Sequence, residues 1–590
     1  MRRFSLLKRL LIANRGEIAL RIMRTAKELG MTTVAVYSEV DRGAAHVAYA
    51  DQAYLLGPAA PSQSYLNIER IVTIARQAEA DAIHPGYGFL AENANFAHAV
   101  LNAGMTWVGP HPTAIEIMGD KIRARRAMVS AGIPVVPGGT KPITTLSELE
   151  RAAHEHGFPL AIKASAGGGG KGLKVAHSPE ELASAFSTAQ REAEAYFKNP
   201  TVYVERYLEN PKHIELQILA DKHGNIVHVG ERDCSLQRRH QKLFEEGPAN
   251  ISVEMRENLR AAGIRAARAI EYDSVGTIET LVSGNQFFFL EMNTRIQVEH
   301  TVSEMLSGLD LIREQLRVAA GEPLGYDQHA INLRGHAIEV RANAEDPTSD
   351  FRPAPGMLTD YREPAGFGVR VDSAVKPGDE IVADYDSLIG KLVVWAPTRP
   401  QALARLRRAI DDYTIGGIPT TLRFLRALSQ DETVVNAGYG TASLEAFART
   451  YTEPLQPEPS ASPAVTPQAL SDVVRVEVNN RLFLVRILDQ LFPTASLRES
   501  SARRPPTSLP RPKVHTDNAD SNEIRSPMHG VIVDLPVVEG MNVTQGQVVA
   551  VIEAMKMMNE IRAHRAGEVV QLSVKIGATV EARTPILILR

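Results

Sequence analysis

Residues 287–300, FFFLEMNTRIQVEH, decide the central part of the fold. An apolar run opens this stretch, and functional side chains then recur at every second position: Glu291, Asn293, Arg295, Gln297 and Glu299. Alternate residues of a strand share one face, so the spacing predicts a strand that carries carboxylate, amide and guanidinium groups on one side. A solvated strand face usually mixes Lys, Thr and Ser. Five functional groups in succession therefore favour a site.

The segment before this stretch, TIETLVSGNQ, contains a turn signal at residues 283–285. A hairpin centred on Asn285 would place Glu279 directly opposite Glu291. Two neighbouring carboxylates repel each other unless a cation lies between them, and Mg²⁺ together with phosphate oxygens suits such a pair. The sequence therefore predicts a metal site on this hairpin.

A glycine-rich segment, FPLAIKASAGGGGKGLKVAH, spans residues 158–177. It is not a P-loop, because Gly172 follows Lys171 and Ser165 stands where the first glycine belongs. Apolar residues on both sides predict a strand, a glycine loop and a second strand. Such a loop forms a lid whose backbone N–H groups fold over phosphates. Lys163 would place an ammonium group beside them.

The N-terminal part predicts a doubly wound α/β unit. Residues 8–37 have the pattern of a strand, a helix and a strand, and residues 66–109 repeat it. The first turn, ANRGEIA, has one glycine where a dinucleotide-binding turn needs three, which argues against a nucleotide site there.

Composition changes sharply near residue 451. Pro- and Ser-rich linkers surround a hairpin candidate, VVRVEVNNRLFLVRI, and lead to an all-β tail. The tail repeats with an offset of 37 residues, so that Gly530 and Gly540 recur as Gly567 and Gly577. Two such halves predict a small flattened β-barrel. Lys556 lies between the halves and between two methionines, a pattern that suggests a surface bound by another protein.

Overall composition excludes several classes of protein. Lys and Arg number 65 against 69 Asp and Glu, and a net charge of −4 argues against nucleic-acid or membrane-surface binding. The single cysteine, Cys234, excludes a disulfide framework and suits a reducing compartment. No apolar run approaches the ~20 residues of a membrane span. We therefore expect a cytoplasmic protein of several domains.

These motifs together resemble a known family. ANRGEIALRI, HPGYGFLAEN, IKASAGGGGKG, ERDCSLQRRHQK and EMNTRIQVEH are similar to biotin carboxylase, an ATP-grasp enzyme, and SPMHG with EAMKMMNE is similar to the biotin carboxyl carrier domain. The chain thus resembles the α subunit of a biotin-dependent acyl-CoA carboxylase of the acetyl- or propionyl-CoA type. The resemblance implies a multi-domain α/β and α+β fold, with a Rossmann-like N-terminal domain, a lid, a C-terminal domain and an all-β biotinyl barrel.

The implied domain boundaries follow the composition. They are an N-terminal domain at 1–120, an ATP-grasp domain at 121–345 with its lid at about 135–205, a C-terminal domain at 346–450, a linker at 451–472, a hairpin at 473–488, a second linker at 489–524 and the biotinyl domain at 525–590.

The resemblance also implies roles for individual residues. Biotin would be attached to Lys556. ATP would be bound by Lys121, Lys163, Gly169, Gly170, Glu205, Leu208, His213, Gln237 and His240. Mg²⁺ or Mn²⁺ would be held by Glu279, Glu291 and Asn293. Bicarbonate would be held by Lys242, Arg295, Gln297 and Val298. Glu299 would be the general base, and Arg341 would face biotin.

The implied partners are a carboxyltransferase β subunit, which no part of the chain resembles, and a biotin protein ligase. We expect a homo-oligomer within a larger hetero-oligomeric complex. The sequence leaves three alternatives open: an acceptor such as pyruvate in place of an acyl-CoA, another ATP-grasp ligase, and a lipoyl carrier. Lipoyl lysines usually lie beside Asp and Ala, whereas Met555 and Met557 flank Lys556. A scaffold that only binds ATP would not explain Glu299 and Arg341.

Overall fold

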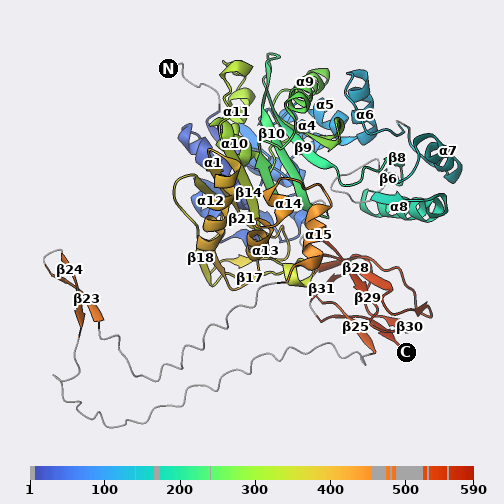
Figure 1. The fold of residues 1–590 in the computed structure, drawn as a ribbon. Coiled ribbons are helices and arrows are strands. Elements are labelled where there is room, and N and C mark those ends of the chain that lie inside the picture. The colour runs from blue at the N-terminus through green and yellow to red at the C-terminus, as the bar shows by residue number, and fades with distance from the viewer. Residues whose placement is uncertain are drawn as a thin grey trace, which may run out of the picture.

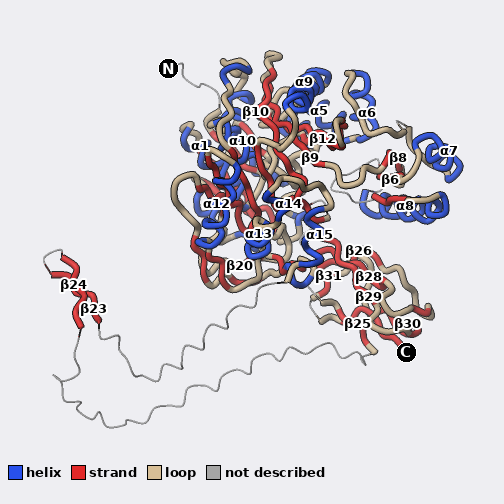
Figure 2. The backbone as a smooth tube through the Cα atoms, in the orientation of Figure 1, coloured by secondary structure: helices blue, strands red, loops and turns tan. Residues whose placement is uncertain are grey.

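A computed structural model describes most of the chain: residues 7–139, 141–164, 173–197, 199–239, 241–452, 473–478, 481–486, 522–527, 530–554, 557–581 and 583–590. Within these ranges, no helix has the length and apolar character needed to cross a membrane. Figure 1 shows the course of the chain, and Figure 2 shows strands enclosed by helices in the main body.

The N-terminal region is a parallel sheet in the order β3-β2-β1-β4-β5. The apolar residues Leu10, Leu11 and Ile12 are fully buried because helices cover both faces of this sheet. The predicted doubly wound unit is confirmed. Its elements are β1 (Arg9–Ile12), α1 (Gly16–Glu28), β2 (Thr32–Ser38), α2 (Ala45–Tyr49), β3 (Gln52–Gly57), α3 (Ile68–Gln77), β4 (Ala82–His84), α4 (Ala94–Asn102) and β5 (Thr106–Trp107).

An eight-stranded antiparallel sheet forms the centre of the molecule, in the order β13-β12-β9-β10-β11-β14-β21-β19. Strands from residues 212–293 and strands from residues 336–396 therefore share one sheet. Its strands are β9 (Lys212–Ala220), β10 (Ile226–Arg238), β11 (Gln241–Gly247), β12 (Val275–Ser283), β13 (Gln286–Asn293), β14 (His336–Asn343), β19 (Val369–Ser373) and β21 (Leu388–Ala396). The helices of this region are α5 (Pro112–Gly119), α6 (Lys121–Ser130), α9 (Val253–Ala269), α10 (His300–Ser307) and α11 (Leu311–Ala319).

The predicted hairpin is present, but its centre differs from the prediction. Ser283 pairs with Gln286, so the turn is centred between Gly284 and Asn285 rather than on Asn285. That register alone would place Glu279 opposite Leu290. A β-bulge between Glu279 and Thr280 shifts the register by one residue and restores the predicted pair of Glu279 and Glu291.

The lid region is a three-stranded sheet, β7-β6-β8, packed against two helices. It lies beside the main body in Figure 1. β6 and β7 pair antiparallel on either side of the glycine-rich loop, which confirms the predicted strand, loop and strand. The loop itself, with Gly169 and Gly170, lies outside the described residues. The elements are α7 (Leu146–His156), β6 (Leu160–Ala164), β7 (Leu173–Ala176), α8 (Leu182–Phe197) and β8 (Val202–Arg206).

The C-terminal region of the main body packs α12 and α13 against the far strands of the central sheet. Its further elements are β15 (Glu345–Asp346), β16 (Arg352–Pro353), β17 (Gly356–Met357), β18 (Asp360–Arg362), β20 (Glu380–Ile381), α12 (Arg399–Asp412), β22 (Thr414–Gly416), α13 (Leu422–Leu428), α14 (Glu432–Val435) and α15 (Ser443–Thr450). Short 3-10 turns are η1 (Glu39–Asp41), η2 (Pro61–Gln63), η3 (Pro179–Glu181), η4 (Gln328–Ala330) and η5 (Pro347–Ser349).

The tail is built from two four-stranded sheets, β25-β32-β30-β27 and β29-β28-β26-β31. Strands of the first half have counterparts 37 residues further on, as the repeat predicts: β26 matches β30, β27 matches β31, and β28 matches β32. The elements are β25 (Glu523–Arg525), β26 (Gly530–Asp534), β27 (Asn542–Val543), β28 (Val548–Ala554), β29 (Met557–Arg562), β30 (Gly567–Leu572), β31 (Thr579–Val580) and β32 (Pro585–Leu589). Lys556 lies outside the described residues, between the end of β28 and the start of β29.

The predicted hairpin in the linker region is also present. β23 (Val473–Val478) and β24 (Arg481–Arg486) pair antiparallel, with Val478 opposite Arg481. Asn479 and Asn480, the predicted turn residues, lie outside the described residues.

Candidate active site

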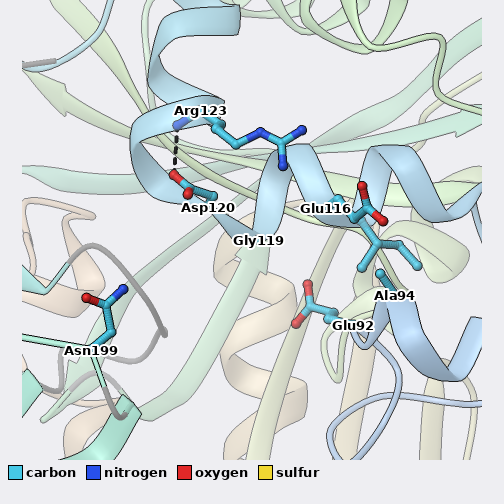
Figure 3. A pocket seen from close by; sticks show the side chains of 8 residues that line it. Glu92, Ala94, Glu116, Gly119, Asp120, Arg123 and Asn199 are labelled. Carbon is cyan, nitrogen blue, oxygen red and sulfur yellow. Dashed lines mark hydrogen bonds between the residues drawn. The ribbon is translucent and has the colours of Figure 1, made fainter. Parts of the chain in front are cut away.

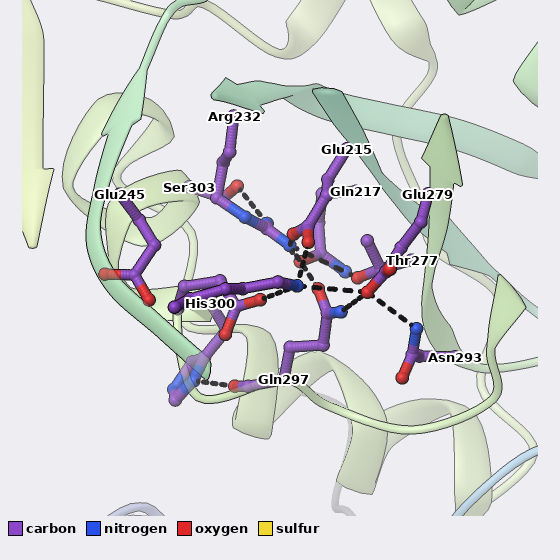
Figure 4. Close-up of polar contacts among 12 residues, drawn as sticks. Glu215, Gln217, Arg232, Glu245, Thr277, Glu279, Asn293, Gln297, His300 and Ser303 are labelled. Carbon is purple, nitrogen blue, oxygen red and sulfur yellow. Dashed lines mark hydrogen bonds and ion pairs between the residues drawn. The ribbon is translucent and has the colours of Figure 1, made fainter. Parts of the chain in front are cut away.

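A largely buried lysine forms the centre of the site. The Lys242 Nζ atom, on β11, lies 3.0 Å from Glu279 Oε1 and 2.9 Å from Glu299 Oε1, and it also contacts Glu215. Figure 4 shows Glu215 and Glu279 side by side on this face of the central sheet. Burial alone would lower the pKa of Lys242, but the three carboxylates raise the pKa well above its ordinary value. A permanent positive charge therefore lies among these acids.

Glu299 is held ionised by two cations. Its Oε1 accepts from Lys242, and its Oε2 accepts from Arg341 Nη2 at 2.9 Å. Burial would raise the pKa of Glu299, but Lys242 and Arg341 lower it well below the usual range. The side chain is thus a carboxylate at every working pH and can accept a hydrogen bond from a bound substrate.

The prediction that residues 294–299 continue the strand is wrong. β13 ends at Asn293, and the chain then turns toward α10, which begins at His300. The cause is packing, because Met292 and Ile296 are buried in two different hydrophobic clusters and the chain must bend to reach both. The functional side chains still converge, because the turn wraps back over the face that carries Lys242.

Arg295 lies at the mouth of the site. Its Nη2 donates to Asn293 Oδ1 at 2.5 Å, and its Nε donates to Glu92 at 2.9 Å. Glu92 also lines an adjacent cavity of about 320 Å³, which extends to the start of α6 (Figure 3). In that cavity Asp120 caps α6 by accepting from the backbone of Arg123 at 2.9 Å. The helix therefore begins at Lys121, a predicted phosphate ligand.

Gln297 has a fixed orientation. Its Oε1 accepts from Arg232 Nη2 at 2.6 Å, so its Nε2 faces Glu279 and donates at 2.7 Å. Arg232 is fully buried and also donates to Glu215 and to Gln217 (Figure 4). Sequence reasoning missed both Arg232 and Glu215. The signal for Glu215 was its alternation with His213 and Gln217 along one strand face.

The predicted metal ligands lie together. Glu279 and Glu291 are cross-strand neighbours, and Asn293 donates from Nδ2 to Glu279 Oε1 at 2.9 Å. Glu291 lies 3.8 Å from the Lys121 ammonium. Two facing carboxylates and a neighbouring amide are hard oxygen donors and fit Mg²⁺ or Mn²⁺. Glu279 already accepts several N–H groups, so Glu291 is the carboxylate that a metal ion could bind with the least rearrangement.

A second group of candidate metal ligands, one histidine and two acids, is also compact but does not need a metal ion. Ligand atoms of His213, Glu215 and Glu279 lie within 4.8 Å of one another. However, the Lys242 ammonium contacts both carboxylates and supplies the positive charge that they need.

Apart from Lys121 at the start of α6, the residues predicted to bind ATP are divided between the predicted lid and the central sheet. Lys163 and Glu205 form a partly buried ion pair on neighbouring lid strands, and Arg125 lies 3.3 Å from Glu205. Leu208 follows β8 and is half-buried. On the central sheet, His213 lies 3.0 Å from Glu279, and Gln237 pairs with Lys242 across β10 and β11. His240 lies outside the described residues.

Arg341 links the site to two further buried acids. Its Nε donates to Glu245 at 2.7 Å, and Glu245 lies opposite Glu339 on the neighbouring strand. Burial raises the pKa of Glu245 to about 7, although Arg341 opposes the shift. Burial likewise raises the pKa of Glu339 to about 8, although Lys391 opposes it.

Comparisons with known proteins identify the family of the chain. Residues 6–115 match the family model "Biotin carboxylase, N-terminal domain", residues 120–326 match "Carbamoyl-phosphate synthase L chain, ATP binding domain", residues 339–446 match "Biotin carboxylase C-terminal domain", and residues 522–589 match "Biotin-requiring enzyme". The biotin-dependent acyl-coenzyme A carboxylase alpha3 subunit of Mycobacterium leprae is 42% identical over 98% of each chain. This chain belongs to the biotin carboxylase family.

Other relatives of this biotin carboxylase match a smaller part of it. A pyruvate carboxylase subunit of Methanothermobacter thermautotrophicus is 51% identical over 72% of this chain and 87% of its own length. The biotin carboxylase domain of the Hydrogenobacter thermophilus 2-oxoglutarate carboxylase has been solved with MgADP and bicarbonate. It is 46% identical to this chain and has a TM-score of 0.74, and the match covers 76% of this chain and 100% of that domain. This biotin carboxylase is therefore a ligase with an ATP-binding region and a biotin carrier domain, and the expected fold class is confirmed.

Proposed function

We propose that this biotin carboxylase uses ATP and bicarbonate to carboxylate biotin on its own carrier domain, and that a separate carboxyltransferase subunit then passes the carboxyl group to an acyl-CoA. The observation that carries the first half is the position of Glu299 between Lys242 and Arg341. The two cations keep this side chain in the carboxylate form, which is the form that a general base needs before it takes a proton.

Bicarbonate must be activated before it can react with biotin, because it is a poor electrophile. In the proposed reaction Arg295, Gln297 and the backbone of Val298 hold bicarbonate, and Glu299 removes its proton. The oxyanion attacks the γ-phosphoryl group of ATP and releases ADP and carboxyphosphate. Lys121, Lys163 and Lys242 offset the charge that spreads over the phosphoryl oxygens.

Metal and biotin complete the chemistry. Mg²⁺ or Mn²⁺ on Glu279 and Glu291, with Asn293, would neutralise phosphate oxygens. Carboxyphosphate would break down to CO₂ and phosphate, and the phosphate would take the proton from the ureido nitrogen of biotin. That nitrogen, on biotin attached to Lys556 in this proposal, would then attack CO₂. Arg341 would stabilise the negative charge that biotin develops, and the lid with Gly169 and Gly170 would exclude water, which otherwise hydrolyses carboxyphosphate.

The length of one alignment supports an acyl-CoA, either acetyl-CoA or propionyl-CoA, as the acceptor. The acyl-CoA carboxylase relative from M. leprae aligns with 98% of this chain, which includes the linker hairpin and the carrier. The pyruvate and 2-oxoglutarate carboxylase relatives align with 72% and 76% of it. Relatives that act on different acceptors share this carboxylase region, so the region itself does not determine which acceptor is used. Pyruvate is therefore the second candidate.

Two experiments test the proposal. Purified chain should cleave ATP in a manner that depends on bicarbonate and is stimulated by free biotin; another ATP-grasp ligase would show no such dependence. Purification from the native source, with mass spectrometry of the bound proteins, should then identify a carboxyltransferase β subunit. Assay of that complex with acetyl-CoA, propionyl-CoA and pyruvate identifies the acceptor. We expect a homo-oligomer of this chain in the complex, with a biotin protein ligase as a transient partner.

A further inference from the structure

Lys391 is a fully buried lysine that the proposed reaction does not use. It lies on β21 with 0% of its surface exposed. A lysine is seldom buried unless its charge is paired, because removal of an ammonium group from water is costly. Glu17 on α1 lies 3.3 Å from its Nζ atom, and Asp372 on β19 lies 3.9 Å away. Burial would lower the pKa of Lys391, but these acids and Glu339 raise it, so the side chain stays charged.

The Nζ atom donates one hydrogen bond that bears on the site. It reaches the backbone carbonyl of Val298 at 2.9 Å. Val298 directly precedes Glu299, and the peptide between them belongs to the segment proposed to hold bicarbonate. This segment is a turn rather than a strand, so ladder hydrogen bonds do not fix it.

Lys391 and Arg341 act as a pair on neighbouring strands. They are directly opposite each other in the register of β14 and β21. Arg341 donates to the side chain of Glu299, while Lys391 donates to the backbone of the residue before it. Two cations directly opposite each other repel, so this arrangement needs the surrounding acids. The two strands thus hold two consecutive residues of the turn from the same side.

We propose that Lys391 is a positioning residue for bicarbonate, which fixes the peptide between Val298 and Glu299 through the Val298 carbonyl. The inference rests on the proposed function, since it assigns a task within the same site. The carbonyl that Lys391 holds lies between the Val298 N–H and the Glu299 side chain, so a fixed carbonyl limits how these two groups move relative to each other. Precise placement of reacting groups is a large part of catalysis. Lys391 does not touch the substrate and acts through the turn.

The experiment separates this task from the simple pairing of charges. Lys391→Met removes the hydrogen bond but leaves Glu17 buried without its cation, so that variant alone could lose stability. Lys391→Met combined with Glu17→Gln removes both charges. Glu17→Gln alone is the matched control, because Lys391 keeps Asp372 and the Val298 carbonyl. For each variant we would measure the thermal midpoint, the KM for bicarbonate, the KM for ATP and the ATP cleavage without bicarbonate.

The double variant should recover the thermal midpoint of the wild type, yet its KM for bicarbonate should rise about tenfold or more. Its KM for ATP and its bicarbonate-independent ATP cleavage should stay within about twofold of wild type, as should every parameter of Glu17→Gln. A normal KM for bicarbonate in the folded double variant would overturn the inference and leave Lys391 as a structural ion pair. Absence of bicarbonate-dependent cleavage in the wild type would instead overturn the proposed function.

Discussion

Glu279 and Glu291 lie directly opposite each other only because a β-bulge interrupts the hairpin between them and its turn. The bulge adds one residue, Leu290, to β13. Without it Glu279 would lie opposite Leu290, and with it Glu279 lies opposite Glu291. A bulge of this kind re-aims side chains, and here it brings two carboxylates together.

Glu291→Gln tests the pair as a metal site. Removal of one ligand charge should lower the rate of ATP cleavage by about 10²–10³-fold at ordinary Mg²⁺ and raise the Mg²⁺ concentration needed for half-maximal rate. The measurement is ATP cleavage over a Mg²⁺ titration. Glu257→Gln, on the exposed surface of α9, is the control and should behave as wild type. A wild-type Mg²⁺ dependence for Glu291→Gln would contradict the assignment.

Arg341→Ala and Glu299→Gln should separate the two chemical steps. Arg341→Ala should reduce carbon fixed on free biotin more than ATP cleavage, because carboxyphosphate can still form and decay in water. Glu299→Gln should depress both, since bicarbonate is not deprotonated. Each loss should be roughly 2–4 kcal/mol in activation free energy. The measurement is the ratio of ADP released to carbon fixed. Equal ratios for the two variants would require the roles to be reassigned.

Glu245 should set the acid side of the pH profile. Its pKa is raised to about 7, so the carboxylate that holds Arg341 is lost as the pH falls through that value. Carbon fixation on free biotin should therefore decline below pH ~7 more than ATP cleavage does. Glu245→Gln imitates the protonated acid, so at pH ~8 this variant should resemble the wild type at low pH, with little further decline on acidification. A variant that keeps the wild-type decline would show that another group titrates.

The stability of the folded chain should vary with pH through Glu339 in the opposite direction from that of an acid whose pKa is lowered by a paired cation. Its pKa rises to about 8 on folding from an ordinary value of 4.5, so between these values the folded state binds the extra proton. The stability that Glu339 contributes is present at low pH and is lost as the pH rises through about 8. Glu339→Gln should therefore raise the thermal midpoint by several degrees at pH ~9 and change it little at pH ~5. A shift of equal size at both pH values would contradict this account.

Lys556→Arg tests the attachment site. Arginine keeps the charge and nearly the length of lysine, but it cannot form the amide to biotin. The variant should not bind streptavidin on a blot, whereas the wild type should. Its carboxylase region should still fix carbon on free biotin, because that reaction uses residues before position 450. Streptavidin binding by the variant would show that another lysine carries biotin.

The central hairpin shows what the sequence could predict. Period-two spacing and a turn signal were sufficient for the hairpin, but the pairing of Glu279 with Glu291 also needs a β-bulge that they do not predict. The repeated strand and helix patterns were sufficient for the N-terminal sheet, and the repeat of 37 residues was sufficient for the two halves of the carrier. The bend after Asn293 was not predictable from local spacing, because it depends on two hydrophobic clusters built by distant parts of the chain. Arg232 and Lys391 were missed for the same reason: their partners come from segments that are distant in sequence.

The first and last strands of the carrier domain pair with each other, with Glu523 opposite Ile588, and the Leu589 N–H donates to the Asn522 carbonyl at 2.7 Å. The domain is therefore closed at the edge where the chain enters and leaves it. A short peptide could join these two points and make the domain a closed ring. New termini could then be opened in the loop before β27, and each strand would keep its place in the two sheets. Such a circular permutant would carry the segment around Lys556, the proposed site of biotin attachment, while being tethered from a different corner of the domain.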